Sequence, residues 1–213
     1  HLYTLPRPTT LEQNATKQIA LFPTATGVEI EKVLVYYGMP SGAHWRFASP
    51  QTNRQLGNQS NKKVDVYLRF QNRERNNLGM PFPRGKVRVY KQDPADGTLE
   101  FVGEDLVDHT PKDEEILIQT GQAFDVVGER TQTDFRVDQR ANVMVESFAI
   151  KVRNHKDEPV DVIVKENLYR WSNWEIIDRS DPYEKIDART IHFNVTVPPD
   201  GEKVVTYTVR YTW

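Results

Sequence analysis

Alternation of apolar and polar residues with a period of two is the feature that most constrains the fold of this chain. It is clearest at residues 63–72, where Val64, Val66 and Phe70 share one side and polar residues such as Arg69 occupy the other. Because successive side chains of a strand point to opposite faces, this pattern predicts a strand with one buried face. No segment shows the three-four spacing of an amphipathic helix strongly enough to compete with these assignments.

The same alternation recurs between short runs that are rich in Pro, Gly and Asn. It predicts strands at residues 16–21, 28–37, 63–72, 86–90, 100–106, 114–119, 124–139, 143–154, 160–168, 190–197 and 202–213. Short strands separated by turn residues predict an all-β fold, specifically an antiparallel, immunoglobulin-like β-sandwich. Glu146 falls on the apolar side of its segment, between Met144 and Phe148, so we expect it to be paired or to lie at the rim.

The domain organisation has two interpretations. Residues 67–72 and 149–154 resemble each other, since both are alternating strands that end in Asn before a polar turn. This echo favours two packed sandwich subdomains: an N-terminal β subdomain over residues 1–121, with a long loop at 38–61, and a C-terminal immunoglobulin-like sandwich over 122–213. The alternative is one continuous β domain over all 213 residues.

Composition excludes several classes of protein. The chain has no Cys, which removes disulfide frameworks, thiolate metal sites and Cys nucleophiles. No apolar run is long enough to span a bilayer. The chain begins with His1 and carries no signal-peptide hydrophobic segment, so we expect a processed form or a fragment whose targeting signal lies outside this sequence.

Charge is distributed unevenly, although the net charge is only −2. Residues 46–91 hold 11 Lys and Arg against 2 Asp and Glu, whereas residues 92–184 hold 10 against 22. Such a split can mark a polyanion-binding face. Alternatively, the β topology brings the two blocks together and their charges neutralise one another. The sequence pI of about 6.3 and the lack of a recognised binding motif argue against a nucleic-acid partner.

Several phrases of the sequence resemble a known family. They are LPRP at 5–8, KQI at 17–19, PRGKVRVY at 83–90, GE at 103–104, HTP at 109–111, GQAFDV at 121–126, PYEK at 182–185, VPP at 197–199 and YTVRY at 207–211. Together they are similar to the bacterial domain family of unknown function DUF4139, the C-terminal region of mucoidy inhibitor A-like proteins. The resemblance implies an exported bacterial protein with a helical or coiled-coil segment ahead of this region. It implies no enzymatic activity, cofactor or catalytic residue.

Aromatic residues supply the candidate binding sites. Tyr169, Trp171 and Trp174 cluster beside Arg170 between two predicted strands, and an exposed set of this kind can stack on sugar rings or grip a peptide. Trp45 and Phe47 carry the same expectation within the long loop. The alternative is that these residues cap a sandwich core with their polar tips at the rim.

The sequence shows no recognised catalytic or metal-binding motif. The turn at 93–97 with Glu100 lacks the spacing of an EF-hand, and the five His residues are scattered. No nucleophile elbow or phosphate-binding glycine loop is present. We therefore expect no catalytic residue, no metal site and no cofactor. The runner-up is a carbohydrate-active or other hydrolase that uses Glu104, Asp105 or Asp108 in a cleft between sheets.

The sequence thus predicts a non-catalytic module of an exported bacterial protein, which binds a protein or an envelope polymer or has a structural role. The expected location is the periplasm, the cell surface or the cell envelope. Edge strands, loops and exposed aromatic side chains would supply the contacts.

Overall fold

The computed structural model describes residues 8–39, 47–58 and 60–213 and contains eleven strands. The strands are β1 (Glu31–Tyr37), β2 (Lys63–Gln71), β3 (Gly85–Gln92), β4 (Leu99–Val107), β5 (Glu115–Asp138), β6 (Val143–Asn154), β7 (Val160–Asn167), β8 (Trp174–Arg179), β9 (Glu184–Lys185), β10 (Thr190–Val197) and β11 (Glu202–Thr212). The one helical element in the described part is a single 3₁₀ turn, η1 (Glu74–Asn76). The all-β prediction is therefore confirmed.

Nine strands form one mixed sheet in the order β8-β11-β6-β5-β2-β1-β7-β10-β9, and β3 and β4 form a separate antiparallel hairpin. Within the nine-stranded sheet β1 and β7 pair in parallel, and the other neighbours are antiparallel. The parallel pair departs from the antiparallel architecture that the sequence predicts. β7 follows β6 in the chain but pairs beside β1, because the chain crosses from one part of the sheet to the other.

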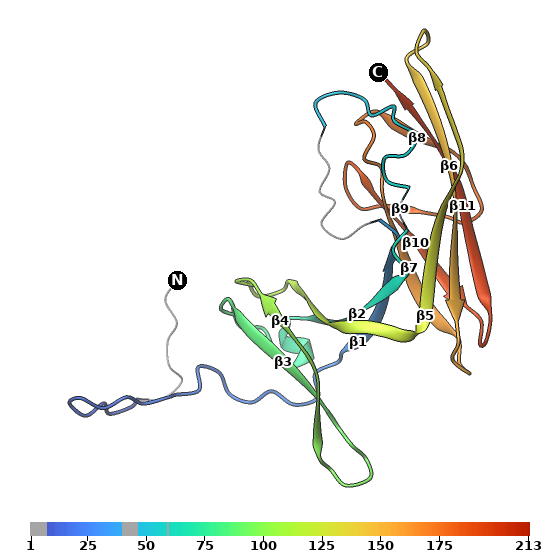
Figure 1. Ribbon diagram of the computed structural model, residues 1–213. Coiled ribbons are helices and arrows are strands. Elements are labelled where there is room, and N and C mark those ends of the chain that lie inside the picture. Colours follow the sequence, from blue (N-terminus) through green and yellow to red (C-terminus); the bar gives the residue numbers. More distant parts are fainter. Residues whose placement is uncertain (1–7, 40–46, 59) are drawn as a thin grey trace.

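The long strand β5 joins the two parts of this sheet. Its first residues pair with β2, whereas Val126 to Asp138 pair with β6. The register shifts within both pairings, and Gly121 adopts a φ of 156°, which other residues rarely adopt. The strand bends near this point (Figure 1), so the two predicted strands at 114–119 and 124–139 are one continuous strand in the structure.

The main core lies where the two ends of the nine-stranded sheet approach each other. Phe193 of β10 and Tyr207 of β11 have ring centroids 5.7 Å apart, and Tyr207 is 5.3 Å from Phe148 of β6. β11 and β6 are hydrogen-bonded neighbours, but β10 and β11 stand far apart in the hydrogen-bonded order, so the contact between Phe193 and Tyr207 crosses the interior. Alternating residues of β6, β7, β10 and β11 are buried as the period-two pattern predicts.

The β3–β4 hairpin projects away from the nine-stranded sheet (Figure 1) and is attached at its base. Gly103 of β4 packs so closely on β5 that a Cβ atom there would lie 2.1 Å from the carbonyl oxygen of Thr120. The Asp105 carboxylate accepts a hydrogen bond of 2.8 Å from the backbone N–H of Gln119. An isolated bridge between Phe82 and Thr110 closes the base.

Two local predictions are wrong or incomplete, and a third agrees with the described residues. Residues 16–21 form no strand, since no described segment offers them a ladder of hydrogen bonds and their side chains are mostly exposed. β8 and β9 were not predicted, because both are short and mostly exposed and lack a clear apolar face. The long loop at 38–61 contains no strand where it is described, and residues 40–46 lie outside the described part.

Candidate functional site

The predicted aromatic cluster after β7 lies largely inside the molecule. Tyr169 and Arg170 are 2 % and 0 % exposed, respectively, so neither presents a free surface to a ligand. Trp171 and Trp174 are half-buried and pack against the main core. The Trp174 indole N–H donates to the carbonyl oxygen of Ala188 at 2.8 Å, so its polar tip already has an acceptor. Aromatic burial of this kind fits residues that cap a core.

Arg170 forms the first of two buried ion pairs. Its Nε and Nη2 donate to the two carboxylate oxygens of Glu146 at 2.8 and 2.7 Å. The same guanidinium also donates to the backbone carbonyls of Gln51, Asn53 and Leu56 at 2.8 to 3.1 Å. The expectation that Glu146 would be paired is confirmed, and Arg170 ties the loop at 47–58 to β6.

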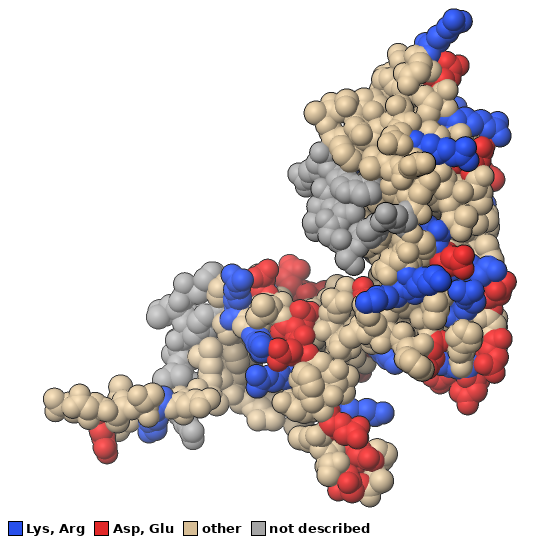
Figure 2. Space-filling model, viewed as in Figure 1, with Lys and Arg blue, Asp and Glu red and all other residues tan. Residues whose placement is uncertain are grey.

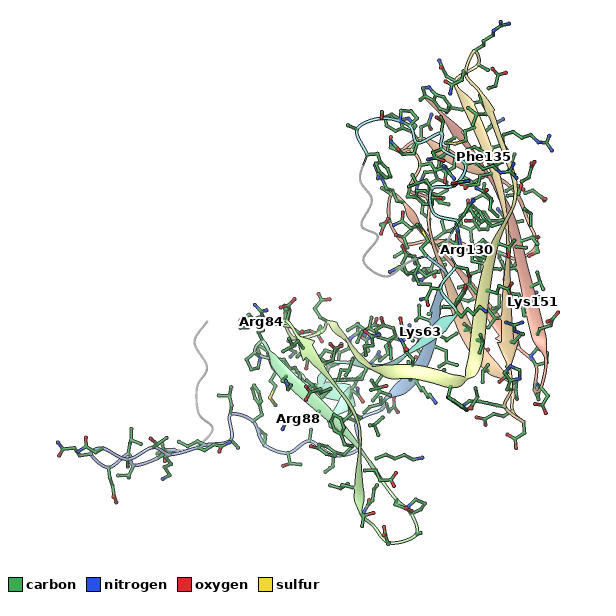
Figure 3. The ribbon with its side chains drawn as sticks, viewed as in Figure 1. Lys63, Arg84, Arg88, Arg130, Phe135 and Lys151 are labelled. Carbon is green, nitrogen blue, oxygen red and sulfur yellow. The ribbon has the colours of Figure 1, made fainter. Side chains whose placement is uncertain are left out.

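Arg130 of β5 forms the second buried pair. Its Nε lies 2.9 to 3.0 Å from both carboxylate oxygens of Glu166 on β7, and Nη1 donates to the carbonyl of Gly57 at 3.0 Å. The Tyr207 hydroxyl donates to Glu166, and the Arg130 guanidinium stacks 3.6 Å above the Phe148 ring. Figure 3 shows Arg130 in the interior of the layered part of the molecule.

We use the name buried clamp for Arg130, Glu146, Glu166 and Arg170 together with the loop at 47–58. The guanidinium groups of the two arginines hold this loop. Both guanidiniums bond backbone carbonyls of this loop, as the hydroxyl of Tyr169 does at 2.7 Å from Leu56 O. Loop carbonyls that would otherwise lack partners are thereby satisfied. Phe47 lies half-buried at the start of this described stretch, and Trp45 lies outside the described residues.

Electrostatics keep the Arg130 guanidinium charged and the nearby buried tyrosines neutral. Burial opposes the charged form of Arg130, but the attraction of Glu166 outweighs it and raises the pKa of the guanidinium above its ordinary value. Burial also raises the pKa of Tyr207 and Tyr211 well above 10 and that of Tyr36 to about 12. These cations stay charged and these hydroxyls stay neutral near pH 7, so they offer no proton for acid–base chemistry.

The carboxylates considered for a hydrolase have other partners: Glu104 and Asp108 are exposed and ion-paired, and the half-buried Asp105 accepts backbone hydrogen bonds. Hydrogen bonds from Lys86 and Arg88 lower the pKa of Glu104, the opposite of what a general acid needs. Asp105 accepts backbone hydrogen bonds from Leu106 and Gln119, and the exposed Asp108 lies 3.6 Å from Arg84. This arrangement gives no support to catalysis by these residues.

The carboxylates of the acidic turn at 93–97 accept hydrogen bonds from residues of the same turn and from Thr98, directly after it. The Asp93 carboxylate accepts the N–H of Ala95, and the Asp96 carboxylate accepts both the N–H and the hydroxyl of Thr98. The backbone hydrogen bond from Thr98 contributes most to lowering the pKa of Asp96. Within the described ranges, no three His, Asp or Glu residues converge as a metal site would require.

The outer face of the β3–β4 hairpin carries exposed apolar side chains that the sequence pattern did not predict as a site. We define the hairpin face as Tyr90, Leu99, Phe101 and Leu106, whose residues are 49 to 67 % exposed. Tyr90 and Phe101 contact each other edge to face, with centroids 5.6 Å apart. The alternation at 86–90 places Tyr90 on this face. In β4 the residues Leu99 to Val102 are all exposed, so no alternation there assigns Leu99 and Phe101 to the same face.

Charged residues around the hairpin face form ion pairs between the basic block of the sequence, residues 46–91, and the acidic block, residues 92–184. Lys86 and Arg88 from the basic block both contact Glu104 from the acidic block, at 2.6 and 3.2 Å. Arg84 pairs with Asp108, and Lys112 pairs with Glu74 at 2.6 Å. Figure 2 shows Lys and Arg next to Asp and Glu over this part of the surface. The structure therefore favours mutual neutralisation for these residues over one continuous polyanion-binding face.

Comparisons with known proteins identify no relative. No protein-family model matches the chain, and no curated protein and no solved structure matches it either. In the described part, no helix has the length and apolar character needed to cross a bilayer. Function therefore has to be argued from the geometry of the clamp and of the hairpin face.

Proposed function

We propose that this chain is a non-catalytic, protein-binding module and that the hairpin face is its contact surface. The observation that carries the proposal is a set of four large apolar side chains, about half exposed or more, on a hairpin that is not part of the nine-stranded sheet. Two of them, Tyr90 and Phe101, are in direct contact. Exposed apolar side chains next to charged residues are typical of protein–protein contact sites. Here the paired residues Arg88 and Glu104 lie between Leu106 and the Tyr90–Phe101 pair, and Lys86 lies opposite Leu106.

A protein partner suits this surface better than a sugar polymer. Leu99 and Leu106 have no ring that could stack on a sugar, and they are the two most exposed members of the face. Within the described part β3 hydrogen-bonds to β4 alone, so its outer edge has backbone groups available for an added strand. The apolar face and this free edge can together bind an extended peptide segment.

We also propose that the module belongs to the DUF4139 family and to an exported bacterial protein located in the cell envelope. For the fold, we propose that the strands on the two sides of the β5 bend act as the layers of an immunoglobulin-like sandwich. The contact between Phe193 and Tyr207 across the interior supports this arrangement. Fractionation of the native bacterium tests the location, and recovery of the protein in the cytoplasm alone would contradict it.

The binding proposal is tested by photocrosslinking in the native bacterium. A photoreactive residue replaces Phe101 and, as a matched control, Val204, which is exposed on β11 of the nine-stranded sheet. We expect a discrete protein adduct from position 101 that disappears when Leu99→Ser and Leu106→Ser are added. Because both leucines are exposed, the double variant should unfold at an unchanged temperature. Equal adducts from positions 101 and 204 would remove the hairpin face from the proposal.

A further inference from the structure

A second region, at the end of β2, is assembled by three asparagine side chains. The buried Asn72 donates to the carbonyls of Met80 and Pro111 at 2.7 and 2.9 Å, and its side-chain oxygen accepts the N–H of Gly79. The segments at 72–80 and 111–114 are thereby held in a fixed geometry.

Asn76 and Asn77 add a third segment. The side-chain oxygen of Asn76 accepts the N–H of Glu29 at 2.7 Å, and the Asn77 amide donates to the carbonyl of Thr26 at 2.9 Å. Buried and part-buried amides with several partners give a rigid platform, because each displaced segment would leave polar groups unsatisfied.

This platform carries an open pocket of about 520 Å³ lined by Arg73, Glu74, Arg75, Lys112 and Asp113. Three cations face two carboxylates, and one of these, Glu74, already pairs with Lys112 at 2.6 Å. Among the described residues, no carboxylate forms an ion pair with Arg73 or Arg75. The Nε of Arg73 is buried and lacks a hydrogen-bond acceptor in the described part.

Arg73 and Arg75 differ in this respect from their neighbours in the basic block. Arg69 pairs with Glu31 at 2.8 Å, and Arg84 and Arg88 pair with Asp108 and Glu104. A buried guanidinium N–H without an acceptor is costly, and a bound acceptor would remove that cost. Two cations of the block that have no carboxylate partner among the described residues thus lie together in a pocket on a rigid support.

We propose that this pocket is a binding site for an oxyanion, a carboxylate or phosphate group. A guanidinium presents its N–H groups in a planar fork that matches two oxygens of such a group. Arg73 and Arg75 bind the oxygens, and Lys112 contributes a third positive charge that it shares with Glu74. This site is distinct from the hairpin face and does not depend on the proposed protein-binding function.

The Arg73 Nε–H resonance in nuclear magnetic resonance spectra is a direct probe. Inorganic phosphate and acetate are titrated separately at constant ionic strength, with chloride as the reference anion. We expect a saturable shift of the Arg73 signal that chloride does not produce. A shift with phosphate alone identifies a phosphate site, one with acetate alone a carboxylate site, and one with both a general oxyanion site. No saturable shift with either anion would overturn the proposal.

Variants show whether the shift belongs to this pocket. Arg73→Gln and Arg75→Gln should each weaken phosphate or acetate binding about tenfold, the size of one charge-assisted hydrogen bond; binding to Arg73→Gln is followed by calorimetry. Glu74→Gln should strengthen binding, because it frees Lys112. The matched control is Arg136→Gln on β5, whose side chain is 79 % exposed and pairs with Asp134. Equal weakening by Arg136→Gln would mean non-specific attraction and would overturn the site.

Discussion

The buried clamp and the β3–β4 hairpin both contain ion pairs of basic and acidic residues, but these pairs are buried in the clamp and exposed in the hairpin. In the clamp, Arg130 and Arg170 are almost fully buried and pair with carboxylates that are 0 % exposed. In the hairpin, Lys86 and Arg88 pair with Glu104 while all three side chains remain at least 40 % exposed. The comparison teaches that an Arg next to aromatic residues in the sequence does not reveal whether it holds the core or meets a partner. Solvent access decides between these roles.

Breaking the buried clamp should have the largest effect on the stability of the protein. Arg170→Met removes the partner of Glu146 and the donor to three loop carbonyls, and it leaves a buried carboxylate uncompensated. We expect the free energy of unfolding, measured in urea, to fall by about 3 to 5 kcal/mol. Glu104→Gln breaks the matched exposed ion pairs in the hairpin and should cost far less, because solvent screens exposed charges. Similar losses for the two variants would contradict the contrast between the regions.

A double variant separates the ion pair from the packing. Arg170→Met combined with Glu146→Leu removes both charges, so it should recover part of the stability lost in Arg170→Met alone. No recovery would show that the bonds from Arg170 to the loop, rather than the ion pair, dominate its contribution.

The second largest effect on stability should come from alkaline pH, through the buried hydroxyl of Tyr36. Burial raises the pKa of Tyr36 to about 12 in the folded chain, whereas an unfolded tyrosine ionises near pH 10. The stabilisation is therefore complete below about pH 10 and is lost as the pH rises toward about 12. In urea unfolding we expect Tyr36 to account for roughly 2 to 3 kcal/mol of the alkaline loss, since each unit of pKa difference corresponds to about 1.4 kcal/mol.

The comparison variant for this experiment is Tyr36→Phe. It lacks the hydroxyl that donates to the carbonyl of Asn61, so it should be slightly less stable at neutral pH. Its stability should then fall less steeply above about pH 10. An identical alkaline loss in both proteins would assign the effect to other groups.

Gly103→Ala should have a smaller effect that is confined to the hairpin. The new Cβ atom would lie 2.1 Å from a backbone oxygen of Thr120, so β4 must move away from β5. Overpacking of this kind costs about 1 to 3 kcal/mol. Amide hydrogen exchange should speed up along β4 and remain unchanged in β6 and β11. Gly85→Ala is the matched control, because nothing lies within 4 Å of its added Cβ; faster exchange there as well would contradict the steric explanation.

The sequence by itself determined which residues could be buried. Period-two alternation assigns Val64, Phe193 and Tyr207 to inward faces, and all three are buried. It also requires a partner for Glu146, because a carboxylate on an apolar face cannot remain unpaired. These conclusions depend on local geometry, which a strand imposes wherever it lies in the sheet.

Only the tertiary structure decided which partners those residues meet. Arg170 and Glu146 are 24 positions apart, and no local pattern predicts that the loop at 47–58 would join them. The parallel pairing of β1 with β7 and the projection of the hairpin likewise depend on how strands are ordered in space. Alternation specifies the face on which a side chain lies, but partner choice results from long-range packing, which a single strand does not encode.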